Sequence, residues 1–225
     1  MIELKGLSKH YRLSGDTLVK AVDNVSLTIR PGDFMMIAGR SGSGKTTLLS
    51  LIGGLTKPTS GTVNIDGVDI WSLNDATQSR FRAEMIGFVF QIPSLLPTLS
   101  VLDNVKLPTM FSKTHDNVGE RALSLLDMVG LPEKAHAYPS QLSVGQQKRV
   151  ALARSLINEP EVVLADEPTS DLDKATETEI MTLIKKVHDD GPRTMVMVTH
   201  NLDLVSYATE VRTMANGALD QGTRR

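Results

Sequence analysis

The sequence predicts an α/β fold in which helices cover a mainly parallel sheet. In its second half, residues 162–165 and 195–198 are continuous apolar runs, and residues 180–187 between them carry an apolar helical stripe. This alternation is typical of parallel strands joined by helical crossovers. Residues 2–30 read as additional strands, which we expect to be antiparallel, because apolar and polar side chains alternate at both ends of this stretch.

The stretch from residue 34 to residue 90 supplies further strands and the first helix. Residues 34–38 are uniformly apolar, as expected for a strand buried on both faces, and residues 86–90 read in the same way. Residues 62–67 predict a strand and a hairpin turn, since they end in Asp-Gly. Helical spacing of apolar residues after the glycine-rich residues 39–44 places a helix start near Lys45.

A helical subdomain is expected over roughly residues 92–150. Apolar side chains recur with helical spacing over residues 122–129, and Gly130 would end that helix. A second helical pattern covers residues 150–157. The strands that complete the sheet lie on both sides of this insert, so we expect residues 1–225 to form a single domain.

Composition excludes several classes of function. The 225 residues include 24 Lys and Arg and 26 Asp and Glu, so a net charge of -2 gives no electrostatic reason to expect nucleic acid as a partner. The absence of cysteine excludes disulfides and thiolate metal sites. We see neither a signal peptide nor an apolar run of the about 20 residues that a spanning helix needs. Any membrane attachment is therefore expected to come from a partner.

The strongest motif is a glycine-rich loop between the strand at 34–38 and the following helix. It fits G-x-x-x-x-G-K-[ST] at every fixed position. Glycines let backbone N–H groups turn toward an anion, Lys45 would reach the β- and γ-phosphates, and Thr46 would ligate Mg²⁺. The candidate phosphate-binding residues are Gly39, Arg40, Ser41, Gly42, Ser43, Gly44, Lys45, Thr46 and Thr47.

Two adjacent carboxylates follow the apolar strand at 162–165. Asp166 would lie at the carboxyl end of this strand, where open α/β sheets bind ligands, and would hold Mg²⁺. Glu167 would orient or deprotonate the attacking water. Two acids after a strand are usually a solvated turn; the phosphate loop favours the catalytic interpretation.

A third motif selects among nucleotide hydrolases. Residues 141–149, Q-L-S-V-G-Q-Q-K-R, resemble the signature of the ATP-binding-cassette (ABC) family, L-S-G-G-Q. Gln91 after a strand, D-E-P-T at 166–169, S-D-L-D at 170–173 and His200 after a strand extend the resemblance over almost the whole chain. It implies a P-loop NTPase (ABC ATPase) core and one nucleotide-binding domain that hydrolyses ATP. A GTPase would need an N-K-x-D segment, which the sequence lacks.

The resemblance also implies roles and partners. Ser143, Gly145 and Gln146 would contact the γ-phosphate bound to the opposite subunit, so that two subunits dimerise head to tail around two ATP molecules. Gln91 would touch Mg²⁺ or water and sense a membrane permease, and His200 would lie at the γ-phosphate.

Tyr11 would stack on adenine, although an exposed strand tyrosine is the alternative interpretation. The sequence departs from the family pattern at Val144 where glycine is usual, at Asp171 and at Asn201. A β-branched residue does not readily take a positive φ, so we expect that position 144 needs no such geometry. None of the three departures removes a catalytic group.

Residues 53–61, 86–91 and 95–105 resemble the subgroup of lipoprotein-release, macrolide-efflux and haem-export ATPases. We therefore expect a motor subunit that drives permease subunits. It would lie on the cytoplasmic side of the membrane, attached through the permease, with the apolar turn 92–99 as the docking site. Ordinary packing of the helical subdomain is the alternative for that turn. A non-transport ABC ATPase that regulates a membrane partner, such as a cell-division complex, stays open.

Overall fold

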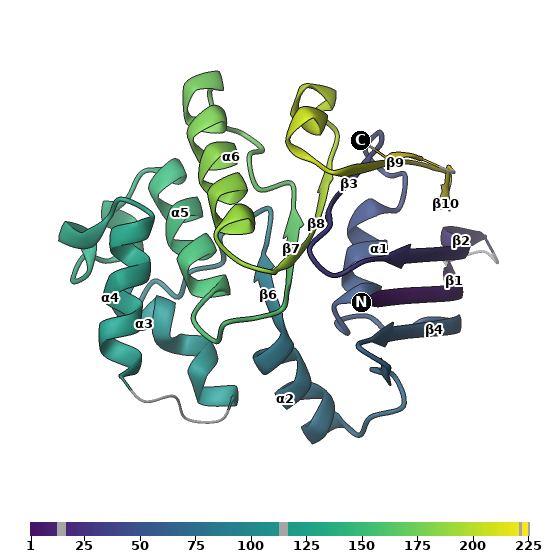
Figure 1. Ribbon diagram of the computed structural model, residues 1–225, viewed down its shortest axis with the longest axis horizontal. Helices are drawn as coiled ribbons and strands as arrows, with labels where there is room; N and C mark the ends of the chain where they lie inside the picture. Colours follow the sequence, from purple (N-terminus) through teal and green to yellow (C-terminus); the bar gives the residue numbers. More distant parts are fainter. Residues whose placement is uncertain (13–16, 113–116, 221, 225) are drawn as a thin grey trace. The chain divides into compact units, whose positions relative to one another are not determined.

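The computed structural model describes residues 1–12, 17–112, 117–220 and 222–224. The chain divides into two compact units, one made of residues 1–78 with 192–225 and the other of residues 79–191 (Figure 1). Helix α2, Asp75–Met85, contains the boundary between them. The expected helical segment 92–150 lies wholly within the second unit.

The first unit holds an antiparallel sheet of four strands. Its strand order is β2-β1-β4-β5, formed by β1 (Ile2–Arg12), β2 (Leu18–Ile29), β4 (Ser60–Ile65) and β5 (Val68–Asp69). The inward side chains of β1 alternate with outward ones, as Ile2 and Leu4 are buried and Lys5 is exposed. The antiparallel N-terminal strands predicted from the sequence are therefore present.

The same unit contains the parallel strands that carry the glycine-rich loop. Strand β3 (Phe34–Ala38) lies between β8 (Thr194–Thr199) and β9 (Glu210–Ala215) and runs parallel to both. All five residues of β3 are buried, which explains its uniformly apolar sequence. Helix α1 (Lys45–Ile52) follows β3 and contacts β8 and β2. The short strands β10 (Ala218–Leu219) and β11 (Thr223–Arg224) pair with β9, and a 3₁₀ segment covers Leu202–Tyr207.

The second unit packs helices around a pair of parallel strands. Strand β6 (Ile86–Val89) pairs with β7 (Val162–Asp166), with Val89 opposite Ala165. Helix α5 (Val144–Ser155) contacts β6 and also α3 (Val101–Lys106), α4 (Val118–Met128) and α6 (Lys174–Asp189) (Figure 1). Three 3₁₀ segments, Leu107–Phe111, Pro132–Lys134 and Pro139–Gln141, connect these helices. Helix α5 is thus the central element of this unit.

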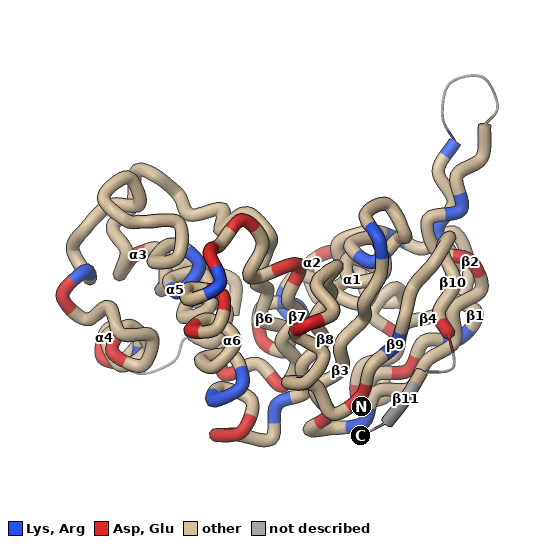
Figure 2. Tube along the Cα trace, turned by 90° about the horizontal axis from the view of Figure 1, so that it is seen from above, with Lys and Arg blue, Asp and Glu red and all other residues tan. Residues whose placement is uncertain are grey.

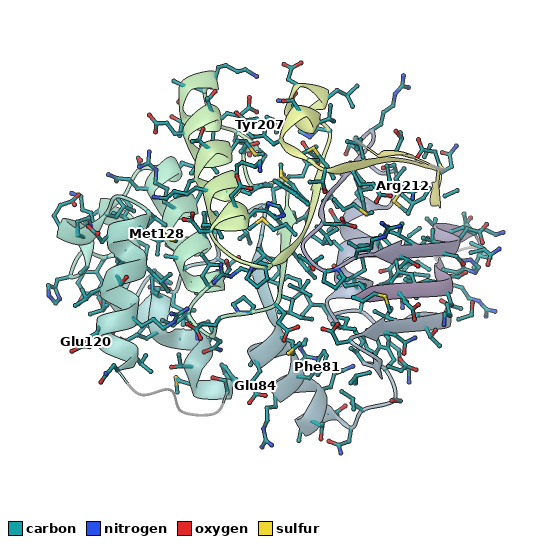
Figure 3. The ribbon with its side chains drawn as sticks, in the orientation of Figure 1. Phe81, Glu84, Glu120, Met128, Tyr207 and Arg212 are labelled. Carbon is teal, nitrogen blue, oxygen red and sulfur yellow. The ribbon has the colours of Figure 1, made fainter. Side chains whose placement is uncertain are left out.

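Side chains fill the space between the elements of each unit, and many of the charged ones lie at the surface. Glu120, in the first turn of α4, is exposed, and Arg212 on β9 donates to the Glu210 carboxylate at 2.7 Å (Figure 3). Basic and acidic residues are interspersed along the trace (Figure 2). Within the described part of the chain, no helix combines the length and the apolar character needed to cross a bilayer.

Candidate functional site

The glycine-rich loop turns tightly between β3 and α1. Gly44 is the N-cap of α1 with φ 106°, and a Cβ at this position would lie 1.9 Å from the Ala21 carbonyl oxygen. No other residue type fits that approach, because the obstacle is backbone. Gly42 also takes a positive φ, 75°. The two glycines therefore allow the loop to fold closely over the helix N-terminus.

The Lys45 ammonium lies within this loop. Lys45 is 5% exposed, and its Nζ donates to the carbonyl oxygens of Gly39 at 2.8 Å and Arg40 at 3.0 Å. The Ser43 hydroxyl is buried and lacks a hydrogen-bond partner among the described residues. A buried hydroxyl of this kind calls for a ligand or water. The cation, the unsatisfied hydroxyl and the helix N-terminus together fit an oxyanion such as a phosphate.

The remaining residues of the loop are more accessible. Arg40, Ser41 and Thr46 are exposed, whereas Thr47 is half-buried. The Thr46 hydroxyl is a hard oxygen donor of the kind that Mg²⁺ prefers.

The end of β8 is hydrogen-bonded to the start of the loop. The Gly39 N–H donates to the Thr199 carbonyl oxygen at 3.2 Å, and the next residue is His200, which is exposed. Asn201 then caps the following 3₁₀ segment, since its side chain accepts from the Asp203 N–H at 3.0 Å. The asparagine that departs from the family pattern therefore has a local structural role.

Tyr11 lies near the end of β1, where it pairs with Val19 of β2. Its side chain is 40% exposed, and the Lys9 ammonium lies 5.1 Å from the ring centroid. The ring is accessible to a ligand. The Lys9 ammonium over its face is attracted to the ring electrons.

In the second unit, the parallel pairing of β6 and β7 brings three candidates to one edge. Asp166 ends β7 and is 8% exposed, Glu167 follows it, and Gln91 lies two residues beyond β6 and is exposed. Glu167 has φ 45°, and its carbonyl oxygen accepts from the Ser170 N–H at 3.1 Å. A left-handed non-glycine residue stores backbone strain of about 1–3 kcal/mol, and such strain clusters at functional sites.

The signature residues form the N-terminus of α5. Ser143 and Gln146 make a reciprocal capping box: the Ser143 hydroxyl accepts from the Gln146 N–H at 3.3 Å, and the Gln146 side-chain oxygen accepts from the Ser143 N–H at 3.0 Å. Both bonds use acceptors, so the hydroxyl proton and the amide NH₂ keep their capacity to donate to an anion.

The two residues between them have different surroundings. Val144 is the first residue of α5, has no positive φ and is 53% exposed, as expected for a position that needs no special backbone geometry. Gly145 is buried, and a Cβ there would lie 2.7 Å from Cγ2 of Thr176 on α6. Packing inside the unit thus restricts position 145, whereas position 144 is open.

Sequence reasoning missed two buried cations on α5. Lys148 is 4% exposed and Arg154 9% exposed. Lys148 occurs within the polar residues 146–149, where a charge is expected to face solvent, and Arg154 follows the apolar residues 150–153. Only the packing of α5 against β6 and three helices reveals their burial.

Each set of candidates is held within its own unit. The loop at 39–47, Tyr11 and His200 belong to the first unit, and Gln91, residues 143–146 and the carboxylates at 166–167 belong to the second.

Residues 22–170 match the family model described as ABC transporter. The chain belongs to this family. As a whole it is 42% identical to an uncharacterised ABC transporter ATP-binding protein of Methanocaldococcus jannaschii, MJ0796, over 98% of this chain and 96% of the relative. It is 41% identical to the macrolide export ATP-binding/permease protein MacB of Hyphomonas neptunium, and spans 35% of that protein's length.

Solved structures agree with this assignment. A dimeric structure of the MJ0796 ATP-binding cassette, in a post-hydrolysis state bound to ADP and Pi, has a TM-score of 0.91 at 40% identity and covers 100% of this chain and 98% of its own. The cbiO1 protein of Clostridium perfringens, part of the ABC transporter complex cbiONQ, has a TM-score of 0.85 at 30% identity, covering 99% and 88%. The predicted fold class is confirmed, and the chain is an ABC ATPase, the motor subunit of a transporter.

Proposed function

We propose that this ABC ATPase uses ATP hydrolysis to drive a membrane permease of the export or mechanotransmission type. It would act as one nucleotide-binding domain over residues 1–225, on the cytoplasmic side of the membrane and attached through the permease. ATP binding is supported by the phosphate loop, in which the buried Lys45 ammonium and the unsatisfied Ser43 hydroxyl lie at the N-terminus of α1. The 41% identity to a protein named as a macrolide exporter supports the export class.

Nucleotide binding is assigned to the first set of candidates. Lys45 would exchange its bonds to the Gly39 and Arg40 carbonyls for the β- and γ-phosphates, and the loop N–H groups would donate to phosphate oxygens. The exposed Tyr11 ring would stack on adenine. Thr46, Gln91 and Asp166 offer hydroxyl, amide and carboxylate oxygens, a donor set that suits Mg²⁺, which when bound neutralises developing charge on the phosphates.

Hydrolysis is assigned to Glu167 with His200 and Gln91. Glu167 would accept a proton from the attacking water, and its left-handed backbone sets the direction of its Cα–Cβ bond at the end of β7. His200 would donate to the γ-phosphate, and Gln91 would orient the water through its amide.

A second copy of the chain is the partner that completes the assembly. Ser143, Gly145 and Gln146 would meet the γ-phosphate held by the opposite protomer. The donors left available by the capping box support this assignment. The dimeric structure of the relative supports the oligomeric state.

ATP binding is tested by the substitution Lys45→Ala. Loss of the loop ammonium should abolish ATP binding measured by calorimetry, because the phosphates lose a buried cation. Lys57→Ala, at an exposed lysine of the same unit, is the matched control and should bind ATP normally. Unchanged affinity in the Lys45 variant would contradict the assignment of the loop.

The permease is expected to dock on the turn that follows Gln91. Ile92 is 74% exposed and Leu96 43% exposed, and the buried Asn104 amide holds this turn by accepting from the Leu96 N–H at 2.7 Å and donating to the Leu99 carbonyl oxygen at 3.1 Å. A rigid, exposed apolar turn suits a helix of a membrane protein.

Leu96→Glu should therefore weaken assembly with the permease and leave the ATPase activity of the isolated chain intact. Co-purification with the membrane partner measures assembly. Leu123→Glu, an equally apolar exposed site on α4 at 44% exposure, is the control and should co-purify as the unaltered chain does. Normal co-purification of the Leu96 variant would count against this docking surface.

A further inference from the structure

One buried charge in the second unit has no role among those that the family resemblance implies. Lys148, on α5, is 4% exposed, yet lysine is rarely buried without partners. Its Nζ donates to the Gln91 carbonyl oxygen at 3.1 Å and to the Ser170 hydroxyl at 3.3 Å. A single ammonium therefore links the signature helix to the residue after β6 and to the loop after β7.

The charges around this ammonium are also informative. Burial lowers the Lys148 pKa, and the nearby carboxylates of Asp171 and Glu167 raise it. Asp171, which departs from the family pattern, has φ 61° and lies in the same loop as Ser170. The aspartate and the buried lysine thus compensate each other electrostatically within the loop that carries Glu167.

The loop after β6 is held at a second point. Arg154, six residues further along α5, donates to the Pro93 and Ser94 carbonyl oxygens at 2.7 and 2.8 Å. Among the described residues of α5, only Lys148 donates a hydrogen bond to Gln91, at the start of this loop. The two cations therefore have separable effects on the loop.

We propose that Lys148 is a positioning residue for ATP hydrolysis: its buried ammonium holds the Gln91 backbone and the Ser170–Asp171 loop against the signature helix, so that the three segments keep one geometry. This inference rests on the proposed roles of Gln91 and Glu167. Lys148 would act through Gln91 and Glu167, the residues to which contact with phosphate and water is assigned. A signature helix that shifts with a bound nucleotide would move both neighbouring segments with it.

The test is Lys148→Met in the full chain, with Lys148→Arg and Lys186→Gln beside it. Methionine fills a similar volume and removes the donor. The kcat for ATP should fall about 10- to 100-fold, because small misplacements of catalytic groups are costly, while KM and the ATP affinity stay unchanged. Lys148→Arg, which keeps a cationic donor, should recover part of kcat. The exposed Lys186 on α6 should tolerate glutamine without effect.

A second readout is hydrogen exchange of the nucleotide-free protein. In Lys148→Met, amides at residues 91–92 and 170–171 should exchange faster, while those near Ser94, held by Arg154, should not. Ser170→Ala removes one acceptor and should change both readouts in the same direction by less, and it serves if the methionine variant does not fold.

Two results would overturn the proposal. One is an unchanged kcat in Lys148→Met; the other is faster exchange spread over the whole unit with no recovery by arginine, which marks a purely structural lysine. The proposed function is judged separately: if the unaltered chain hydrolyses ATP and Glu167→Gln does not, the function stands whatever Lys148 does.

Discussion

Glu167 adopts a backbone conformation that residues with side chains seldom take, and it does so directly after the buried end of β7. A residue held in this region needs surrounding structure to enforce it. The following turn supplies part of that support, since the Ser170 N–H donates to the Glu167 carbonyl oxygen. The backbone therefore fixes the direction of the Cα–Cβ bond from which this carboxylate extends.

Glu167→Gln should separate binding from hydrolysis. Glutamine keeps the size and hydrogen-bonding capacity of the side chain but cannot accept the proton. ATP should therefore still bind, and the hydrolysis rate should fall by a factor on the order of 10² to 10⁴. Phosphate release measures the rate, with the exposed Glu133→Gln as control. Hydrolysis at the unaltered rate would mean that another group is the base.

For individual residues, the sequence predicted the residue types of the candidate site but not their surroundings. The motif spacing predicted Lys45, Asp166 and Glu167. It could not reveal that Lys148 is buried, because burial depends on the helices that α5 contacts. The left-handed conformation of Glu167 was equally hidden, since local sequence preference does not favour it.

Among the elements, α6 shows how a helix start depends on one acidic side chain. The Asp173 carboxylate accepts from the Ala175 and Thr176 N–H groups, both at 3.1 Å, and from the Thr176 hydroxyl at 2.6 Å. These bonds, led by that from the Thr176 hydroxyl, lower the Asp173 pKa below its ordinary value of 3.8. The charged carboxylate is thus favoured in the folded protein.

The sign of the pH dependence follows from this depressed pKa. The stabilisation is present above the unfolded value and is lost as the pH falls through the lower folded value. Asp173→Ala should therefore unfold at a lower temperature than the unaltered chain at pH 7. The difference between the two unfolding temperatures should narrow as the pH drops below 3.8. Thermal denaturation at a series of pH values measures both unfolding temperatures. Asp173→Asn, which keeps a hydrogen-bond acceptor, should lose less thermal stability than Asp173→Ala. A difference in unfolding temperature that does not depend on pH would contradict the role of the charge.

Elements with a strong apolar pattern were predicted, and polar or short ones were not. The five residues of β3 and the start of α1 at Lys45 lie where the sequence placed them. Helix α2 was missed because none of its residues is buried, so no apolar stripe marks it. Helix α3 has only six residues, too few to establish a period.

For the whole molecule, the net charge of -2 and the mixed signs along the trace leave no strong field to keep two copies apart (Figure 2). Association can therefore be controlled by the nucleotide. Residues that the family places in contact with the opposite protomer, Ser143 and Gln146, lie at an exposed or half-exposed helix start.

The Glu167→Gln chain should shift from monomer to dimer with ATP and Mg²⁺ but not with ADP. Adding Ser143→Arg should prevent this shift, because a bulky side chain would fill the space for the opposite γ-phosphate. Light scattering gives the mass in each state. A Glu167→Gln chain that binds ATP without dimerising, both alone and with its permease, would contradict the two-nucleotide assembly.

The close approach of Gly145 to Thr176 affects how genetic screens of this protein should be interpreted. Any side chain at position 145 meets α6 of its own protomer, at 2.7 Å from Thr176 Cγ2 for the first carbon alone. A loss-of-function allele at this codon therefore combines a packing conflict inside the unit with any effect on nucleotide contact, and does not by itself support that contact. Val144, 53% exposed beside it, tolerates changes in size without such a conflict. Alleles at codon 144 are consequently the ones whose phenotypes can be attributed to what the signature meets outside its own subunit.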